Sequence, residues 1–352
     1  MSNITLIGID LAKNVFHLHA VDDKGKQMKV TKLSRLKLAE YLYRSEPVIV
    51  AMEACASAHY WGRLCTSLGH EARLISPQFV KPFVKSNKND RNDARAICEA
   101  ALRPDMNFVP VKTVEQQAVL SLHRVREMLI GQRTATINQF RGLLTEFGLP
   151  APTGRRALFS MIPAMIEDLR KISPAFLITC ISQQWEHLRQ LEQHINEVTH
   201  QIEMHARQSD IARRLQTIPG IGPITASALD AYVGKATQFR TGRQLAAWLG
   251  LVPRQHSTGG KSVLLGTSKR GNSYLRQLFV HGARAVVSVV CRSPDASKQD
   301  KTITGWLTRK HMNVAVVAMA NRNARIAWAV IAHERSFDNN YREQLTNQLL
   351  PG

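Results

Sequence analysis

The first hundred residues alternate between short apolar runs and amphipathic stretches of helical length. The apolar runs predict strands. The amphipathic stretches predict helices, one of them starting after Ser34, a typical helix N-cap residue. The predicted strands cover residues 4–9, 15–21, 27–33, 48–52 and 71–75, and the predicted helices cover 34–45 and 57–68. Two strands joined by a hairpin turn, a third strand and then alternating helices and strands indicate a mixed α/β domain.

The middle of the chain has the spacing of long helices. Residues 114–147 predict one helix, which closes at Gly148 with Pro150 just beyond it. A second helix carries an apolar seam at three- and four-residue steps, made of Leu188, Leu191, Ile195, Val198 and Ile202. The seam fits either a coiled coil with a second copy or packing within one chain. Residues 150–174, between the two helices, predict a connector with a short helix.

The remainder, residues 212–334, is again globular and mostly helical, with glycine-rich turns. We therefore predict an α/β domain over residues 1–104, a helical coiled-coil region over 105–207 and a mostly α C-terminal domain over 208–345. The chain has no apolar run near the roughly 18 residues that span a bilayer, and its N-terminus lacks the features of a signal peptide. These observations predict a cytoplasmic protein without a membrane partner.

Charge narrows the class of partner. The formal net charge is +20, which favours a polyanion such as nucleic acid over a merely solvated surface. Residues 231–294 contain no Asp or Glu, although ten Lys and Arg residues lie there. The five cysteines are scattered without a C-x-x-C pair, which argues against a zinc site or a disulfide framework.

Four carboxylates have the placement expected of metal ligands. Asp10 and Glu53 each follow a predicted strand, and side chains at the carboxyl ends of strands converge on one edge of an α/β sheet. Asp90 and Asp93 are three residues apart at the start of a predicted helix, so they share a helical face. Hard oxygen ligands of this kind favour Mg²⁺, with Mn²⁺ as the alternative. Singly, each could be a turn, capping or ion-paired residue.

Basic residues surround the second pair of carboxylates and are predicted to bind nucleic acid: Lys88, Arg91 and Arg95. Two further segments have the composition of phosphate-binding loops. Residues 218–225, with Gly220 and Gly222 between two helices, fit a helix-hairpin-helix element or an ordinary helical hairpin. In residues 250–272, hydroxyl side chains and glycines lie among cations, and the predicted contacts are Arg254, Thr258, Lys261, Lys269 and Arg270. A hydroxyl there fits a nucleophile, or the loop only grips the backbone.

The order of these motifs resembles the DEDD transposases of the insertion-sequence 110 family. The motifs are I-G-I-D-x-A-K at residues 7–13, M-E-A at 52–54, N-D-x-x-D-A-R at 89–95, I-P-G-I-G at 218–222, G-L-x-P-R at 250–254 and S-T-G-G-K at 257–261, followed by S-K-R-G at 268–271. The form P-R-Q-H-S-T-G-G-K is most similar to the 1111 subgroup. Each motif is weak alone, but six in order over nearly the whole chain are specific.

The resemblance implies a RuvC-like, ribonuclease-H-like N-terminal domain with Asp10, Glu53, Asp90 and Asp93 as metal ligands. It implies a C-terminal serine that links covalently to DNA, a structured bridge or seek RNA that guides recombination of donor and target double-stranded DNA, and a tetramer. Relatives often have Glu-Ser-Gly or Ser-Ser-Gly where this chain has Ser257-Thr258-Gly259. The ungapped match favours Thr258 as nucleophile, whereas the hydroxyl type favours Ser257, which we prefer.

Three other functions compete with a transposase. A RuvC-like junction resolvase would use the four carboxylates without a covalent serine, and it is the principal alternative. A sugar kinase or related ATPase also begins with a Gly-x-Asp strand, but it needs further glycine-rich phosphate loops. A non-enzymatic DNA-binding scaffold leaves the clustered carboxylates without a purpose, since they repel DNA when no metal is bound.

Overall fold

The computed structural model describes residues 4–84, 90–259, 261–292 and 301–338. The chain divides into two compact units, Met1–Gln117 and Ala118–Gly352, and each is described by itself. The first unit is a mixed α/β domain and the second is mostly helical, as the sequence patterns predict.

A six-stranded sheet forms the centre of the first unit, with the strand order β3-β2-β1-β4-β5-β6. Its strands are β1 (Leu6–Asp10), β2 (Val15–Val21), β3 (Gln27–Ser34), β4 (Ile49–Glu53), β5 (Glu71–Ile75) and β6 (Phe108–Val109). The first three strands form an antiparallel meander, whereas β1, β4 and β5 run parallel. Five of the six strands were predicted to within two residues at each end, and the short β6 was not predicted.

Helices cover both faces of this sheet. On one face, α1 (Arg35–Arg44) and α2 (Ala58–Ser67) pack against alternate buried residues of the strands, such as Ile7 and Ile9 of β1. On the other face, α4 (Asp90–Ala101) packs against the intervening residues, such as Leu6 and Ala51. A short α3 (Pro77–Val80) and a 3-10 turn, η1 (Lys81–Phe83), connect β5 toward α4. Residues along β1, β2, β4 and β5 therefore alternate between the two faces, whereas the pairing of β2 with β3 has a register shift at Ala20 and Val21.

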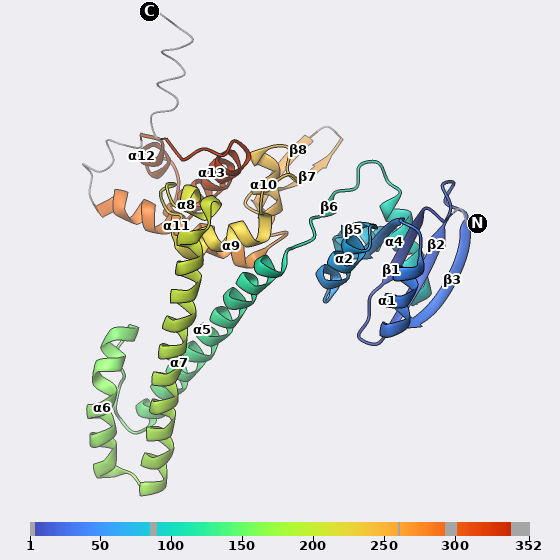
Figure 1. Cartoon of the computed structure of the whole chain (residues 1–352). Coiled ribbons are helices and arrows are strands. Elements are labelled where there is room, and N and C mark those ends of the chain that lie inside the picture. The colour runs from blue at the N-terminus through green and yellow to red at the C-terminus, as the bar shows by residue number, and fades with distance from the viewer. Residues whose placement is uncertain (1–3, 85–89, 260, 293–300, 339–352) are drawn as a thin grey trace, which may run out of the picture. The chain divides into compact units, whose positions relative to one another are not determined.

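Three helices form an elongated bundle (Figure 1): α5 (Val114–Glu146), which lies almost wholly in the second unit, α6 (Arg155–Ile172) and α7 (Ala175–Gln208). The predicted seam lies on α7, and Leu191 and Ile195 pack with Leu129 of α5 in the same chain. Leu188 joins a cluster formed by α5, α6 and α7. The seam is thus occupied by packing within the chain. The connector helix α6 is longer than the short helix expected, at 18 residues.

The body that follows the bundle contains α8 (Asp210–Leu215), α9 (Pro223–Val233), α10 (Gly242–Trp248), the hairpin β7 (Pro253–Thr258) and β8 (Lys261–Thr267), α11 (Ser273–Arg292), α12 (Lys301–Leu307) and α13 (Met312–Ala332). Within the described ranges, α13 is the one helix long and apolar enough to cross a membrane, and 50% of its apolar window is buried. Because α13 packs against α8, α10, α11 and α12, we interpret it as a core helix.

Candidate catalytic face and nucleic-acid interface

The first two predicted carboxylates lie at the ends of neighbouring parallel strands. Asp10 is the last residue of β1 and Glu53 is the last residue of β4, and the preceding pair, Ile9 and Met52, are directly in register. Leu6 and Ala51 lie in the buried cluster that packs against α4. Asp10 is four residues after Leu6 and Glu53 is two residues after Ala51, and alternate residues of a strand point to the same face. Both carboxylates therefore lie on the α4 face of the sheet, at its open edge. We call the α4 side of this edge the catalytic face, because Asp10 and Glu53 are the predicted metal ligands.

The helix α4 runs antiparallel to β1, with its first turn toward Asp10. A Cβ on Gly8 would lie 2.5 Å from the carbonyl oxygen of Ala94 and 2.6 Å from Cys98 Sγ, so only glycine allows this close approach. The last turn lies at the opposite end of the sheet, because the residue after α4, Leu102, approaches Gly25 in the turn after β2. This direction carries the N-terminal residues of α4, including Asp93, to the end of β1 that holds Asp10.

Electrostatics agree with this placement. The pKa of the Cys55 thiol, two residues after Glu53, is raised, foremost by desolvation and then by the negative charges of Glu53 and Asp10. One sulfur atom thus experiences both carboxylates, as expected when the two side chains share one edge of the sheet.

The remaining predicted residues of this region are described in part. Asp90 is the first residue of α4, but its side chain and that of Arg91 lie outside the described residues, as does Lys88 entirely. Arg95 is exposed and its Nε lies 3.0 Å from Glu99 Oε1 one turn along α4. Over the residues with described side chains, no group of three His, Cys, Asp or Glu residues is close enough to hold a metal ion.

The donor chemistry nevertheless fits a divalent cation. Asp10 and Glu53 supply carboxylate oxygens at adjacent strand ends, and the direction of α4 brings its first turn, with Asp93, toward the same edge. Oxygen-only donors of this kind suit hard ions such as Mg²⁺ or Mn²⁺.

The predicted nucleophile loop is an exposed hairpin, β7–β8. All six residues of β7, among them Arg254, Ser257 and Thr258, are exposed. Ser257 pairs with Ser262 and Thr258 with Lys261, so the two candidate hydroxyls point to opposite faces of the ribbon. The Nε2 of Gln255 donates a hydrogen bond of 2.7 Å to Ser257 Oγ, which leaves the serine proton available to another acceptor. Local geometry therefore separates the two candidates by face.

The basic loop after the ribbon is held by its backbone. The amide of Lys269 donates to the carbonyl of Gly250, and Arg276 Nη1 donates to the carbonyl oxygen of Arg270 at 3.0 Å. Lys269 has a left-handed φ of 52°, and the side chains of Lys269 and Arg270 are exposed. The fixed backbone presents both cations to solvent.

The glycine turn predicted to bind phosphate lies between α8 and α9. Gly220 has a φ of 88°, and a Cβ there would lie 2.8 Å from the carbonyl oxygen of Gly282 in α11. The turn is also fixed by Asn323, whose Nδ2 donates to the carbonyl of Pro219 at 2.8 Å. Gly222 is the exposed N-cap of α9. Gly220 thus serves close helix packing, and a helix-hairpin-helix role for this turn stays a prediction.

Two residues that the sequence analysis did not single out lie beside Asp10. His17 of β2 is directly paired with Asp10, and Lys32 of β3 is directly paired with His17. Directly opposed residues of antiparallel strands share a face, so the three form one row across the sheet. In the sequence, the turn at residues 22–25 indicates that the strands on either side of it pair with each other. The register of that pairing, which aligns His17 with Lys32, comes from the structure.

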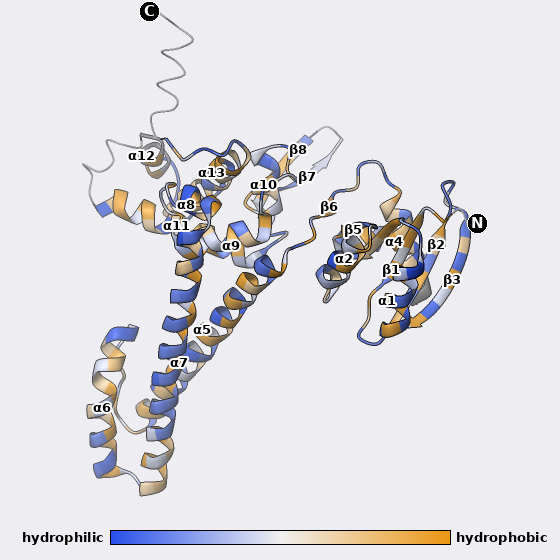
Figure 2. Cartoon of the chain, in the orientation of Figure 1, coloured by the Kyte–Doolittle hydropathy of each residue, from blue (hydrophilic) through white to orange (hydrophobic). Residues whose placement is uncertain are grey.

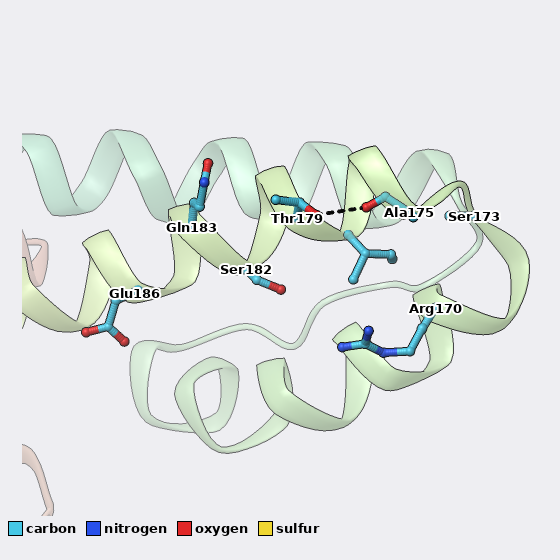
Figure 3. Close-up of a pocket in the computed structure, with 8 residues that line it drawn as sticks. Arg170, Ser173, Ala175, Thr179, Ser182, Gln183 and Glu186 are labelled. Carbon is cyan, nitrogen blue, oxygen red and sulfur yellow. Dashed lines mark hydrogen bonds between the residues drawn. The ribbon is translucent and has the colours of Figure 1, made fainter.

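One cavity lies between α6 and α7 and contains none of the predicted site residues. Arg170 of α6 and Ser182 and Glu186 of α7 are among its mostly polar lining residues (Figure 3). The side chain of Thr179 is engaged within its own helix, donating to the carbonyl of Ala175.

Two family models match the chain. One, described as "Transposase IS116/IS110/IS902 family", matches residues 212–299, and a DEDD model described as "Transposase" matches residues 7–148. The first match includes the β7–β8 ribbon and the basic loop. The second includes all four predicted carboxylates. Both regions that the sequence singled out are therefore within matched segments.

Three curated relatives are similar over almost their full lengths. A probable family 20 transposase of Pseudomonas aeruginosa is 49% identical over 95% of this chain and 99% of its own. The transposase of insertion sequence IS1328 from Yersinia enterocolitica is 44% identical over 94% of this chain and 97% of its own. The transposase of IS1111A from Coxiella burnetii is 41% identical over 96% of this chain and 92% of its own.

An α/β domain with strand-end carboxylates, a helical C-terminal part and these matches define a transposase, an enzyme that cuts and rejoins DNA. The chain belongs to the IS116/IS110/IS902 family of insertion-sequence transposases. The mixed α/β unit is consistent with the ribonuclease-H-like fold expected of a DEDD transposase, and that membership implies use of a divalent metal ion.

Proposed function

We propose that this transposase recombines DNA by pairing a divalent metal site with a serine nucleophile under the guidance of a structured RNA. The observation that carries the proposal is the in-register placement of Asp10 and Glu53 at the open edge of the sheet, on the face covered by α4. Asp90 and Asp93, at the start of that helix, complete the proposed ligand set.

Asp10, Glu53, Asp90 and Asp93 would hold Mg²⁺, with Mn²⁺ as a substitute. The bound ion would supply Lewis-acid stabilisation of charge on a phosphodiester. The chain's own residues would set its position: two of the proposed ligands lie at strand ends, and the contact at Gly8 fixes the helix that carries the other two.

Ser257 is the proposed nucleophile. Its Oγ would form a bond to phosphorus, its proton would pass to a base, and a deoxyribose oxygen would leave with a proton. The phosphodiester bond energy is thereby kept in a covalent protein–DNA link until rejoining. Support comes from the exposure of Ser257 and from the Gln255 hydrogen bond, in which the serine oxygen is the acceptor.

Nucleic acid is the proposed partner of the basic C-terminal body. The net charge of +20 and the ten cations of residues 231–294 favour phosphate binding, with Arg254, Lys261, Lys269 and Arg270 exposed. We assign this surface to donor and target DNA and to the guide RNA, and we propose that the protein acts as a tetramer. RNA that copurifies with the protein, once sequenced, is the direct check of guidance.

A denaturing gel of labelled DNA after reaction tests the serine. We expect a covalent adduct with the protein, and mass spectrometry of the attached peptide should place the DNA on Ser257. Ser257→Ala should lose both adduct and joining. The matched control Thr258→Ser, on the other face of the ribbon, should retain both.

The same gel tests the principal alternative, a RuvC-like junction resolvase. A resolvase using metal-activated water leaves cut DNA without an adduct. Cleavage with no adduct would overturn the serine mechanism, and an adduct on Thr258 would overturn the choice of residue.

A further inference from the structure

The row formed by Asp10, His17 and Lys32 extends the catalytic face across the antiparallel half of the sheet. Asp10 and His17 are half-buried at the edge, and Lys32 is exposed. Neighbouring strands are about 4.8 Å apart, so the row spans roughly 10 Å from β1 to β3. The cation is thus near the carboxylates but on a different strand.

Core packing independently assigns this row to the α4 face. Two residues beyond His17, His19 is buried, and its carbonyl accepts a hydrogen bond of 3.1 Å from Cys98 Sγ of α4. Val21, two residues further along β2, belongs to the cluster of buried residues around α4. By contrast, Phe16 and Leu33, a directly opposed pair, pack on the α1 and α2 side.

The surrounding charge is positive. Residues 24–39 contain no Asp or Glu and six exposed basic residues, which are Lys24, Lys26, Lys29, Lys32, Arg35 and Lys37. Figure 2 shows hydrophilic and hydrophobic segments mixed along β3. On this edge strand, Lys29 and Lys32 point to opposite faces, since Lys29 Nζ lies 4.8 Å from the ring centroid of Tyr41 in α1. Only Lys32 of the pair shares the face of Asp10.

We propose that Lys32, assisted by His17, binds the phosphate backbone of the DNA strand being cut and so positions that strand at Asp10. The proposal rests on the proposed function, because it assumes that cutting occurs at the catalytic face. Carboxylates repel a DNA strand, and an adjacent cation offsets that repulsion. The row of roughly 10 Å from β1 to β3 places Lys32 within a few nucleotides of the phosphate at Asp10.

Photocrosslinking in the full-length protein tests the proposed contact between Lys32 and DNA directly. The photoreactive residue p-benzoylphenylalanine is placed at position 32 or, as the matched control on the same strand, at position 29. The probe is a labelled 30-nucleotide DNA, single-stranded or duplex, bound in the Asp10→Asn background with Mg²⁺ present. We expect strong crosslinking from position 32 and weak crosslinking from position 29. Equal crosslinking from the two positions, or none from either, would overturn the proposal.

Kinetics provide the second readout. Lys32→Gln should raise the DNA concentration at half-maximal cleavage by about tenfold with little change in kcat, as expected for a lost phosphate contact. Lys32→Arg should restore it, His17→Gln should shift it in the same direction, and Lys29→Gln should leave it unchanged. A loss of kcat alone in Lys32→Gln would contradict a binding role.

Failure of the proposed Lys32 contact and failure of the proposed function give different results. Strong crosslinking from position 32, together with no DNA cutting by the protein that retains Asp10, would refute the metal-site chemistry and keep the Lys32 contact. Cutting that depends on Asp10, together with equal crosslinking from positions 29 and 32, would keep the chemistry and refute the Lys32 contact.

Discussion

Asp10 and Glu53 are the residues on which the proposed chemistry depends most directly. Each ends a strand whose preceding residues are buried, so the backbone that carries it is fixed on both sides of the sheet. The carboxylates are only half-buried, which leaves them accessible to an ion and to a phosphate. This combination of a rigid backbone and an open side chain suits a ligand better than a structural carboxylate.

Neutralising either carboxylate should abolish strand cleavage without unfolding the protein. Asp10→Asn and Glu53→Gln keep the side-chain shape but remove a ligand charge. A loss of several kcal/mol of transition-state stabilisation corresponds to roughly a thousandfold in rate. The measurement is cleavage of labelled DNA, with circular dichroism as the test of folding. Asp90→Asn and Asp93→Asn should behave alike.

The matched control is Asp23→Asn, in the exposed turn at the other end of the sheet, beyond Val21 and its partner Leu6. It should cut DNA at the wild-type rate. Normal recombination by a well-folded Asp10→Asn protein would remove Asp10 from the metal site.

Among the elements, the contact between α4 and β1 decides how the proposed site would be assembled. Gly8 allows the backbone of α4 to lie directly on β1, and the buried Cys98 fixes the helix to β2 through the carbonyl of His19. The direction of α4 follows from these contacts, and with it the position of Asp93.

Gly8→Ala should disturb this contact. The added Cβ would lie 2.5 Å from the carbonyl oxygen of Ala94, so α4 must shift, and we expect a loss of about 1–3 kcal/mol in the free energy of unfolding. The cleavage rate should also fall, and by more than the loss of folded protein accounts for, because the first turn of α4 moves. Urea denaturation and the cleavage assay measure the two effects.

Gly142→Ala in α5 is the control, since nothing lies within 4 Å of a Cβ there and alanine favours a helix. It should be neutral or stabilising. Wild-type stability and activity in Gly8→Ala would show that α4 does not rely on this contact.

A second connection between elements is a buried polar network around His123 of α5. Its Nδ1 lies 2.9 Å from the hydroxyl of Tyr274 in α11, and its Nε2 lies 3.2 Å from Ser227 Oγ in α9. Burial, foremost, and the nearby Arg126 lower the pKa of His123 to about 4. Although a serine and a histidine are paired here, both are buried, so the pair links the elongated bundle to the helical body and has no access to DNA.

This network should make the second unit less stable in mild acid. His123 stays neutral in the folded protein down to a pH near 4, while the unfolded chain binds a proton below about 6.5. Stability is therefore complete above pH 6.5 and falls as the pH decreases toward 4, by about 2 kcal/mol between pH 7.5 and 5. Urea unfolding at both pH values, followed by fluorescence, measures the difference.

His123→Gln should remove most of that pH dependence, whereas His200→Gln, at an exposed position on α7, should keep it. An unchanged pH dependence in His123→Gln would assign the effect to other groups.

On the scale of the whole molecule, positive charge is the dominant property. The net charge is +20, and two stretches of the chain contain basic residues but no Asp or Glu. One is residues 231–294 in the C-terminal part, and the other is residues 24–39 in the α/β unit. Both units therefore carry a dense positive stretch, and Asp10 and Glu53 lie at strand ends of the first unit.

DNA affinity should consequently fall steeply with salt. Binding that releases counterions from six or more phosphates weakens by about a thousandfold between 50 and 200 mM salt. Lys269→Glu with Arg270→Glu should lower affinity and flatten the salt dependence without altering metal binding, as fluorescence anisotropy and calorimetry would show. Affinity that stays flat over this range would contradict an interface dominated by phosphates.

Local patterns in the sequence determined the strands, the long helices and the identity of the strand-end acids. Alternation and apolar runs report which side of a segment is buried, and they do so without reference to distant residues. Thus β2, β3 and β5 were predicted nearly residue for residue, and α5 ends before Gly148 as its sequence indicates. The carboxylates Asp10 and Glu53 were found because they interrupt apolar runs.

Only the tertiary structure decided which of these elements meet. The strand order places β1 between β2 and β4, and this neighbourhood aligns Lys32, His17 and Asp10 in one row. The seam of α7 is covered by α5 and α6 of the same chain. Both outcomes depend on contacts between residues far apart in the sequence, whose energies come from packing and register, and a local pattern of apolar and polar residues does not contain them.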